Sequence, residues 1–170
     1  MKINERFIWA LSVLNPQSSD NILEIGCGAG LFADLICQQL VKGKYTAVDR
    51  SQSMIKMARK RVTDGVESGK AIFHETEFSC TNFPNASFHK IVAFNVNVFW
   101  KDPKKEMELI RSYLKPKGLF YLFYQHPYES TLSVVEKAKQ PLMKEGFVIV
   151  DAVLQQMKPY SAFCVISKPA

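Results

Sequence analysis

Short runs of apolar residues alternate along the chain with longer segments in which apolar residues recur every three to four positions. The first run, residues 21–25, predicts a buried strand, and residues 31–41 predict a helix after it. The apolar face of that helix consists of Phe32, Leu35, Ile36 and Leu40. Strands that alternate with amphipathic helices are typical of a sheet that helices cover on both faces.

The same alternation continues through the rest of the chain. It predicts further strands at residues 45–48, 71–74, 90–96, 118–124, 147–154 and 162–167. Asp102 and Pro103 stand in the order of a helix cap followed by a first-turn proline, so we expect a helix to begin there. Another helix is expected from Thr131 towards Glu145, with a kink or a restart at Pro141.

The last two predicted strands are separated by too few residues for a helical crossover, so they are expected to form an antiparallel hairpin. The whole pattern predicts an α/β fold with a seven-stranded, mostly parallel sheet, helices on both faces and this hairpin at its C-terminal end. We expect residues 1–170 to form a single domain, because no repeat, charge block or Gly/Ser-rich linker divides the sequence.

The composition agrees with that fold class. Of the 170 residues, 47% are hydrophobic and 22% are charged, as in a soluble globular domain with an ordinary core. The cysteines have no CxxC spacing and no histidine at a metal-ligand spacing, so we expect no metal site and a reduced, cytoplasmic chain. Residues 4–14 are patterned as an amphipathic helix, and no apolar run is long enough to cross a membrane.

Three glycines follow the first predicted strand at alternate positions, Gly26, Gly28 and Gly30. Without a Cβ, the backbone can turn sharply there and lie against a ligand, and the next helix offers its unpaired amides. The spacing differs from the G-x-G-x-x-G of dinucleotide-binding folds, and no G-K-[ST] phosphate loop is present. The sequence therefore predicts a small-molecule site in which phosphates are not the main anchor.

Two acids flank this glycine turn. Glu24 precedes the glycines, where a carboxylate repels a pyrophosphate and attracts an ammonium group. Asp49 ends the second predicted strand, about 20 residues beyond the turn, where a carboxylate accepts hydrogen bonds from both hydroxyls of a ribose. A cationic ligand that carries a ribose satisfies both acids.

Together these residues resemble the class I S-adenosylmethionine-dependent methyltransferases. The similarity is carried by residues 22–30, by residues 48–51 with Met54, by Glu77 and Phe78, and by residues 83–88. The resemblance implies a Rossmann-like fold over nearly the whole chain. It also implies S-adenosylmethionine (SAM) as cofactor and S-adenosylhomocysteine (SAH) as product.

The resemblance further implies how the matching residues bind the cofactor. The backbone from Gly26 through Cys27 to Gly28 is expected along its methionine and ribose parts. Glu24 is expected to meet the methionine ammonium group, directly or through water, and the backbone of Asn95 is expected to approach the same group.

A second set of matching residues is expected around the nucleoside. Ser51 and Met54 are expected to border the adenine, and Arg50 belongs to the same cofactor-binding segment. Glu77 is expected to accept a hydrogen bond from the exocyclic amine, while the Phe78 amide donates to a ring nitrogen. Glu77 departs from the aspartate that is common in the family, and its longer side chain is expected to reach the amine from a shifted backbone.

One further departure lies outside the cofactor motifs. His89 follows Phe88 where the family commonly has aspartate. We expect this change to cost only a structural contact.

The methyl acceptor is predicted from the segments that follow the fourth and fifth strands. His126 lies after the fifth strand, at the edge where open α/β sheets bind ligands, and is the candidate base for an oxygen acceptor. The candidate walls of an aromatic acceptor pocket are Asn97, Phe99, Trp100, Tyr124 and Tyr128.

The choice of acceptor rests mainly on motifs that the sequence lacks. It contains no [DN]-P-P-[YF] sequence after the fourth strand and no Pro-Cys nucleophile of the kind that attacks pyrimidines. The net charge of +6 does not by itself indicate nucleic acid, because the basic residues are spread over several predicted helices and alternate with acids. We therefore favour a small-molecule acceptor. A protein or RNA methyltransferase and a non-catalytic cofactor-binding subunit are the alternatives.

Overall fold

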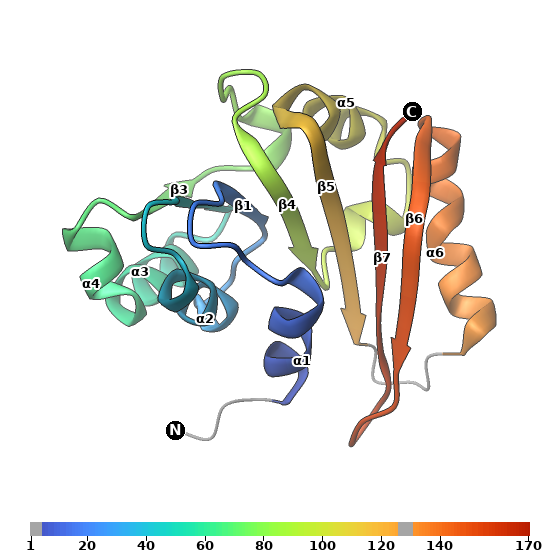
Figure 1. Ribbon diagram of the computed structural model, residues 1–170, viewed down its shortest axis with the longest axis horizontal. Helices are drawn as coiled ribbons and strands as arrows, with labels where there is room; N and C mark the ends of the chain where they lie inside the picture. Colours follow the sequence, from blue (N-terminus) through green and yellow to red (C-terminus); the bar gives the residue numbers. More distant parts are fainter. Residues whose placement is uncertain (1–4, 126–130) are drawn as a thin grey trace.

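Seven strands form one sheet in the order β3-β2-β1-β4-β5-β7-β6 (Figure 1). This computed structural model describes residues 5–125 and 131–170. The strands are β1 (Ile22–Ile25), β2 (Tyr45–Asp49), β3 (Ala71–Glu75), β4 (Phe88–Phe94), β5 (Leu114–Gln125), β6 (Phe147–Gln155) and β7 (Ala162–Pro169). The first five strands pair in parallel, β7 is antiparallel to β5, and β6 is antiparallel to β7. The predicted α/β sheet and its C-terminal hairpin are confirmed.

Helices cover both faces of this sheet. Their bounds are α1 (Glu5–Leu14), α2 (Leu31–Gln39), α3 (Gln52–Arg61), α4 (Thr63–Glu67), α5 (Lys104–Tyr113) and α6 (Leu132–Lys144), and two 3₁₀ turns are η1 (Phe78–Cys80) and η2 (Asn97–Trp100). One core cluster joins α1, α2 and α3 to one face of the sheet, and a second joins α5 and α6 to the other. The two-faced arrangement expected from the apolar pattern is therefore present.

The two clusters are separated by the alternation of side chains along each strand. On β1, for example, Ile22 lies in the first cluster and Leu23 in the second. Phe94 of β4 stacks on Phe123 of β5 with ring centroids 5.5 Å apart, and Phe7 of α1 meets Phe94 edge-on at 5.0 Å. The N-terminal helix is thus part of the core.

Several element boundaries differ from the sequence prediction, and the contacts of the chain explain two of them. The strand β5 begins at Leu114, directly after α5, because Phe88 pairs with Leu114 before the register shifts and Lys90 pairs with Leu119. The helix α5 begins one residue after its cap, Pro103, and Asp102 does not cap it.

Asp102 is instead oriented towards another helix. Its Oδ1 lies 3.9 Å from the Nζ of Lys144, at the end of α6. The helix α6 continues through Pro141, which lies in its last four residues. Pro141 has no amide hydrogen to donate to the carbonyl four residues earlier, so α6 continues here without that hydrogen bond.

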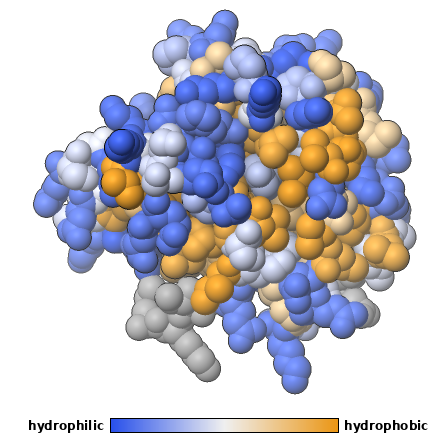
Figure 2. Space-filling model, in the orientation of Figure 1, coloured by the Kyte–Doolittle hydropathy of each residue, from blue (hydrophilic) through white to orange (hydrophobic). Residues whose placement is uncertain are grey.

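Apolar side chains also reach the surface. Figure 2 shows them gathered over the part of the sheet formed by β5, β7 and β6, and Val148 and Val150 of β6 are about half exposed there, at 46% and 50%. Within residues 5–125 and 131–170, no helix is long and apolar enough to cross a bilayer.

Candidate cofactor-binding site

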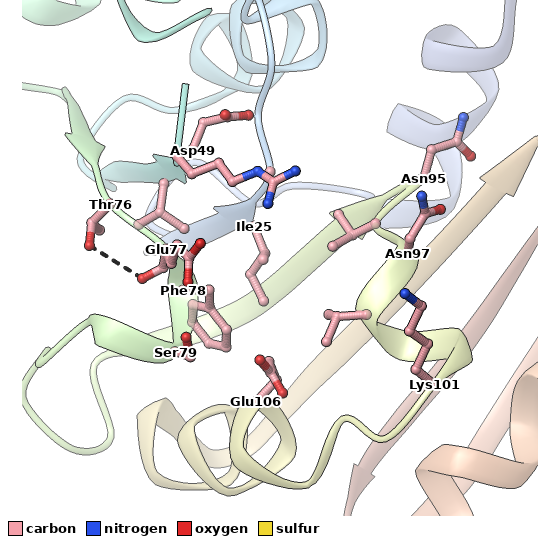
Figure 3. A pocket seen from close by; sticks show the side chains of 15 residues that line it. Ile25, Asp49, Thr76, Glu77, Phe78, Ser79, Asn95, Asn97, Lys101 and Glu106 are labelled. Carbon is pink, nitrogen blue, oxygen red and sulfur yellow. Dashed lines mark hydrogen bonds between the residues drawn. The ribbon is translucent and has the colours of Figure 1, made fainter. Parts of the chain in front are cut away.

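A cavity of about 580 Å³ lies at the carboxyl ends of β1, β2, β3 and β4. Its volume is within the range of pockets that bind small molecules, and parallel α/β sheets bind their ligands at this edge. The polar residues around it are Asp49, Arg50, Thr76, Glu77, Ser79, Asn95, Asn97, Lys101 and Glu106 (Figure 3).

The glycine turn after β1 forms one side of this cavity. Gly26 has a φ of +70°, and a Cβ placed on it would lie 2.9 Å from Cγ2 of Val96, so the turn packs directly on the segment after β4. Gly28 has a φ of +52°, and a Cβ placed on it would meet no atom within 4 Å. The turn therefore keeps bare backbone next to open space at Gly28.

Asp49, at the end of β2, connects this turn to the next helix. Its Oδ2 accepts a hydrogen bond from the Gly28 amide at 2.9 Å, and its Oδ1 accepts one from the Ser51 amide, also at 2.9 Å. Ser51 in turn caps α3 by accepting a hydrogen bond from the Met54 amide. An ionised carboxylate has about four lone-pair sites, so each oxygen of Asp49 can accept one more hydrogen bond.

Glu24 lies beneath the turn and does not line the cavity. Its side chain is buried in the sheet, with the residue 2% exposed, and the Tyr45 hydroxyl donates a hydrogen bond to its Oε2. Burial raises the pKa of Glu24 to about 8, the Asp49 carboxylate adds to this rise, and the hydrogen bond from Tyr45 opposes it. A carboxyl group with such a pKa is mostly protonated at neutral pH.

The segment after β3 forms the opposite side of the cavity. Glu77 precedes η1 with its side chain exposed, whereas Phe78 is buried and meets Tyr113 of α5 edge-on at 6.2 Å. Thr76 donates a hydrogen bond to the Glu77 carbonyl at 3.3 Å, as drawn in Figure 3. The anchored Phe78 thus fixes the backbone that carries the exposed acid beside it.

The segment after β4 begins with Asn95, which has a φ of +56°. Its side chain bonds twice to the backbone of Gln125, accepting from the amide at 2.8 Å and donating to the carbonyl at 3.3 Å. These bonds extend the pairing of β4 and β5 by one side chain and hold the left-handed turn in place at the cavity.

Six of the eleven predicted cofactor-binding residues line the cavity: Gly26, Asp49, Arg50, Glu77, Phe78 and Asn95. Five others lie around it without lining it: Glu24, Cys27, Gly28, Ser51 and Met54. His126 and Tyr128 lie outside the residues that the structure describes.

The predicted aromatic wall is largely part of the core. Phe99 and Tyr124 are each 1% exposed, and Trp100 packs on Tyr124 with ring centroids 4.8 Å apart. Asn97 is the described member of that set that lines the cavity. The apolar pattern could not distinguish a pocket wall from a core in this segment.

Sequence reasoning missed Thr76, Ser79, Lys101 and Glu106 as cavity residues. Lys101 follows β4, and Glu106 lies in the first turn of α5. Residues that follow a parallel strand lie at the edge where such sheets bind ligands, and this position could have indicated both. Within the described parts of the chain, no group of three or more His, Cys, Asp or Glu residues could hold a metal ion.

Residues 22–118 match a family model described as a methyltransferase domain. The chain belongs to this methyltransferase family. The matched segment contains β1 to β4, the strands whose carboxyl ends surround the cavity. Together with the fold, it assigns the chain to the class I SAM-dependent methyltransferases.

Two curated methyltransferases show how far the similarity extends. The malonyl-[acyl-carrier protein] O-methyltransferase of Priestia megaterium is 30% identical over 127 residues, which are 71% of this chain but only 43% of that protein. The uncharacterized methyltransferase YdaC of Bacillus subtilis is 28% identical over 169 residues, 94% of this chain and 89% of that protein. The chain therefore spans less than half of the first relative and most of the second.

A solved methyltransferase with bound SAM has the same fold. The magnesium protoporphyrin IX methyltransferase of Synechocystis PCC 6803 superimposes with a TM-score of 0.70 and 13% identity, covering 99% of this chain and 78% of that one. At 13% identity this likeness shows the fold, and the family match is what assigns the chain to the SAM-dependent class.

The residues of this methyltransferase fit such a ligand. Space without side chains lies beside Gly28, and the carboxylate of Asp49 has acceptor sites left for two hydroxyls. The cavity opens between that carboxylate and the exposed Glu77, which can accept from an amine.

Proposed function

We propose that this protein transfers a methyl group from SAM to a small-molecule acceptor at the cavity beside Asp49. The observation that carries the proposal is the junction of Asp49 with the glycine turn, because one carboxylate both holds bare backbone in place and keeps acceptor sites for a ribose. The malonyl-[acyl-carrier protein] O-methyltransferase among the relatives supports an oxygen acceptor.

In this proposal, Asp49 binds the ribose hydroxyls and the backbone at Gly26, Cys27 and Gly28 follows the cofactor towards its methionine end. When bound, SAM supplies a methyl carbon that a nucleophile attacks as the carbon–sulfur bond breaks and its electron pair remains on sulfur. The protein contributes mainly by holding the acceptor atom about 3–3.5 Å from that carbon.

The nucleoside is bounded by the segments after β2 and β3. Arg50, Ser51 and Met54 lie on the adenine side, Glu77 accepts from the exocyclic amine, and the Phe78 amide donates to the ring. Each of these residues lines the cavity or lies at its border. Because η1 is held by Phe78, the backbone that carries Glu77 is held in place before the ligand arrives.

Three residues are proposed for the methionine end and the acceptor. The Asn95 backbone approaches the ammonium group, and Glu24, in its ionised form, attracts that group through water from beneath the turn. His126 is proposed as the base that removes a proton when the acceptor is a hydroxyl. An acceptor that is already ionised needs no such base.

A methylation screen with labelled SAM tests this function. A metabolite extract is divided into an untreated portion, a portion filtered to remove macromolecules, and portions treated with protease or ribonuclease. A small-molecule acceptor predicts label in the filtered portion, and Asp49→Ala, which weakens cofactor binding, serves as the control that lowers it.

Two results would favour the alternatives. Loss of label after protease or ribonuclease treatment would indicate a protein or RNA acceptor. SAH binding without label in any portion would indicate a cofactor-binding subunit.

A further inference from the structure

Two side chains of opposite charge line the cavity at a distance from the glycine turn. Lys101 follows η2, and Glu106 lies at the start of α5. Figure 3 shows both side chains reaching into the cavity, from different elements. The cofactor contacts proposed above use neither residue.

Lys101 and Glu106 do not neutralise each other. Within the described residues, the ammonium nitrogen of Lys101 has no carboxylate oxygen within 4.0 Å, that of Glu106 included. The neighbouring acid, Asp102, lies instead 3.9 Å from Lys144. A cation and an anion that share a cavity without meeting leave room for a ligand between them.

Lys101 also borders a second hollow. This hollow has a volume of about 350 Å³ and lies between the start of α5 and the end of α6. Its lining residues are Lys101, Asp102, Pro103, Gln140, Pro141 and Lys144. A ligand held at Lys101 therefore has space on both sides of the lysine, and a second ammonium group, that of Lys144, lines the outer space.

We propose that this end of the cavity recognises a methyl acceptor that carries a carboxylate and, near it, an N–H or O–H donor. Lys101 binds the carboxylate and Glu106 accepts the hydrogen bond from the donor. This assignment rests on the proposed methyltransferase function and names the class of its acceptor.

The two charges select against simpler molecules. Hydrogen bonds to charged groups contribute roughly 1.5–3 kcal/mol each, more than those between neutral groups. A neutral phenol leaves Lys101 without an anion. A fatty acid has no donor for Glu106, an ionised carboxylate that can only accept. Acids that carry an amide or a hydroxyl satisfy both groups, and the longer ones can extend into the second hollow.

Calorimetry with a defined probe tests the assignment. The probe is malonyl-N-acetylcysteamine, which has a free carboxylate and an amide N–H, and its methyl ester is the uncharged counterpart. Both are titrated into the protein saturated with SAH. Lys101→Gln is expected to weaken binding of the acid at least tenfold and that of the ester less than twofold. Glu106→Gln is expected to weaken both probes to a similar extent, because both retain the amide.

Lys104→Gln is the matched control, because Lys104 is exposed on α5 and lines neither hollow. It is expected to bind the acid as the unchanged protein does. Equal affinity of Lys101→Gln and the unchanged protein for the acid would overturn the assignment. So would an equal loss of SAH affinity in Lys101→Gln, since that result would place Lys101 at the cofactor.

The test separates this inference from the proposed function. If the unchanged protein binds SAH but neither probe, the acceptor assignment fails while the cofactor proposal stands. If SAH itself does not bind, the proposed function fails first and the acceptor assignment fails with it.

Discussion

The amide nitrogen of Gly28 lies 2.9 Å from Oδ2 of Asp49, so the carboxylate that ends β2 holds the turn that follows β1. The second oxygen holds the Ser51 amide at the start of α3. Three segments at the carboxyl edge of the sheet therefore depend on one side chain, which shapes the cavity as well as lining it.

Replacement of Asp49 by alanine is expected to weaken SAH binding more than tenfold. Both backbone amides lose their acceptor and the ribose hydroxyls lose theirs; a tenfold change corresponds to about 1.4 kcal/mol. Isothermal titration calorimetry measures the effect, with Asp64→Ala on exposed α4 as the control. Unchanged affinity in a folded Asp49→Ala variant would remove the residue from the cofactor site.

Replacement of Gly28 by alanine is expected to weaken SAH binding strongly and to lower the stability of the fold only a little. Gly28→Ala places a Cβ in open space, so the protein folds with a backbone penalty of roughly 1–2 kcal/mol, but the new group occupies the space proposed for the cofactor. Gly69→Ala is the matched control, because Gly69 has a φ of +69° and equally open surroundings after α4. Similar melting temperatures with SAH affinity lost only in Gly28→Ala are expected; equal SAH affinity would contradict the placement.

Gly26→Ala is expected to be the more destabilising change in the same turn. Its Cβ would collide with Val96, and its φ of +70° adds strain. The double variant Gly26→Ala with Val96→Ala removes the collision and is expected to recover part of the lost melting temperature. No recovery would show that the contact between the two turns is not the cause.

The free energy of unfolding is expected to fall as the pH rises through the range in which Glu24 titrates. Its pKa is near 4.5 in the unfolded chain and about 8 in the folded protein, so between these values only the folded state holds the proton. Glu24→Gln cannot titrate and retains an oxygen that can accept from Tyr45. Relative to the unchanged protein, it is expected to gain stability from pH 5 to pH 8.5, by on the order of 1–4 kcal/mol. The free energy of unfolding of both proteins is measured in urea at each pH. A constant difference between them over this pH range would refute the assignment.

Tyr45→Phe tests the other partner of the buried pair. The variant leaves Glu24 without its hydroxyl donor, and an unpaired buried polar group costs roughly 1–3 kcal/mol. Tyr160→Phe changes an exposed residue and is expected to alter stability by less than about 0.5 kcal/mol. Chemical denaturation at neutral pH compares the two, and equal effects would mean that the pair does not stabilise the fold.

His126→Ala is expected to lower turnover of hydroxyl acceptors while SAH affinity is unchanged. Removal of a general base commonly costs about 10²- to 10⁴-fold, whereas a carboxylate acceptor has no proton to lose. Turnover assays on one acceptor of each kind therefore separate two roles. An equal loss for both acceptors would identify a structural residue.

Much of the fold could be predicted because the apolar pattern reports burial directly. The strands differ from their predicted ranges mainly where pairing with a neighbouring strand sets the end of the strand. Pairing of Phe88 with Leu114 draws residues 114–117 into β5, and no local pattern contains that contact. Likewise, Asp102 stands before a proline, as a helix cap does, but its side chain makes no hydrogen bond to α5. It lies beside Lys144, which belongs to a helix and follows some 40 residues later in the sequence.

The site was predictable where its residues act through backbone geometry or strand ends. Gly26 and Asp49 could be placed from their spacing alone. The orientation of Glu24 could not, because it depends on Tyr45, which reaches it from the neighbouring strand. Lys101 and Glu106 were missed because single charges in a polar segment have no periodicity that distinguishes them from solvated residues.

The position of β7 between β5 and β6 sets the order in which the nascent chain can complete its sheet. Both neighbours leave the ribosome before the strand that joins them, so until β7 emerges β5 has an unpaired edge and β6 has no strand to pair with. Open apolar edges of this kind are where growing chains aggregate or recruit chaperones. Any delay before β7 leaves the ribosome would therefore prolong the interval in which these edges are open.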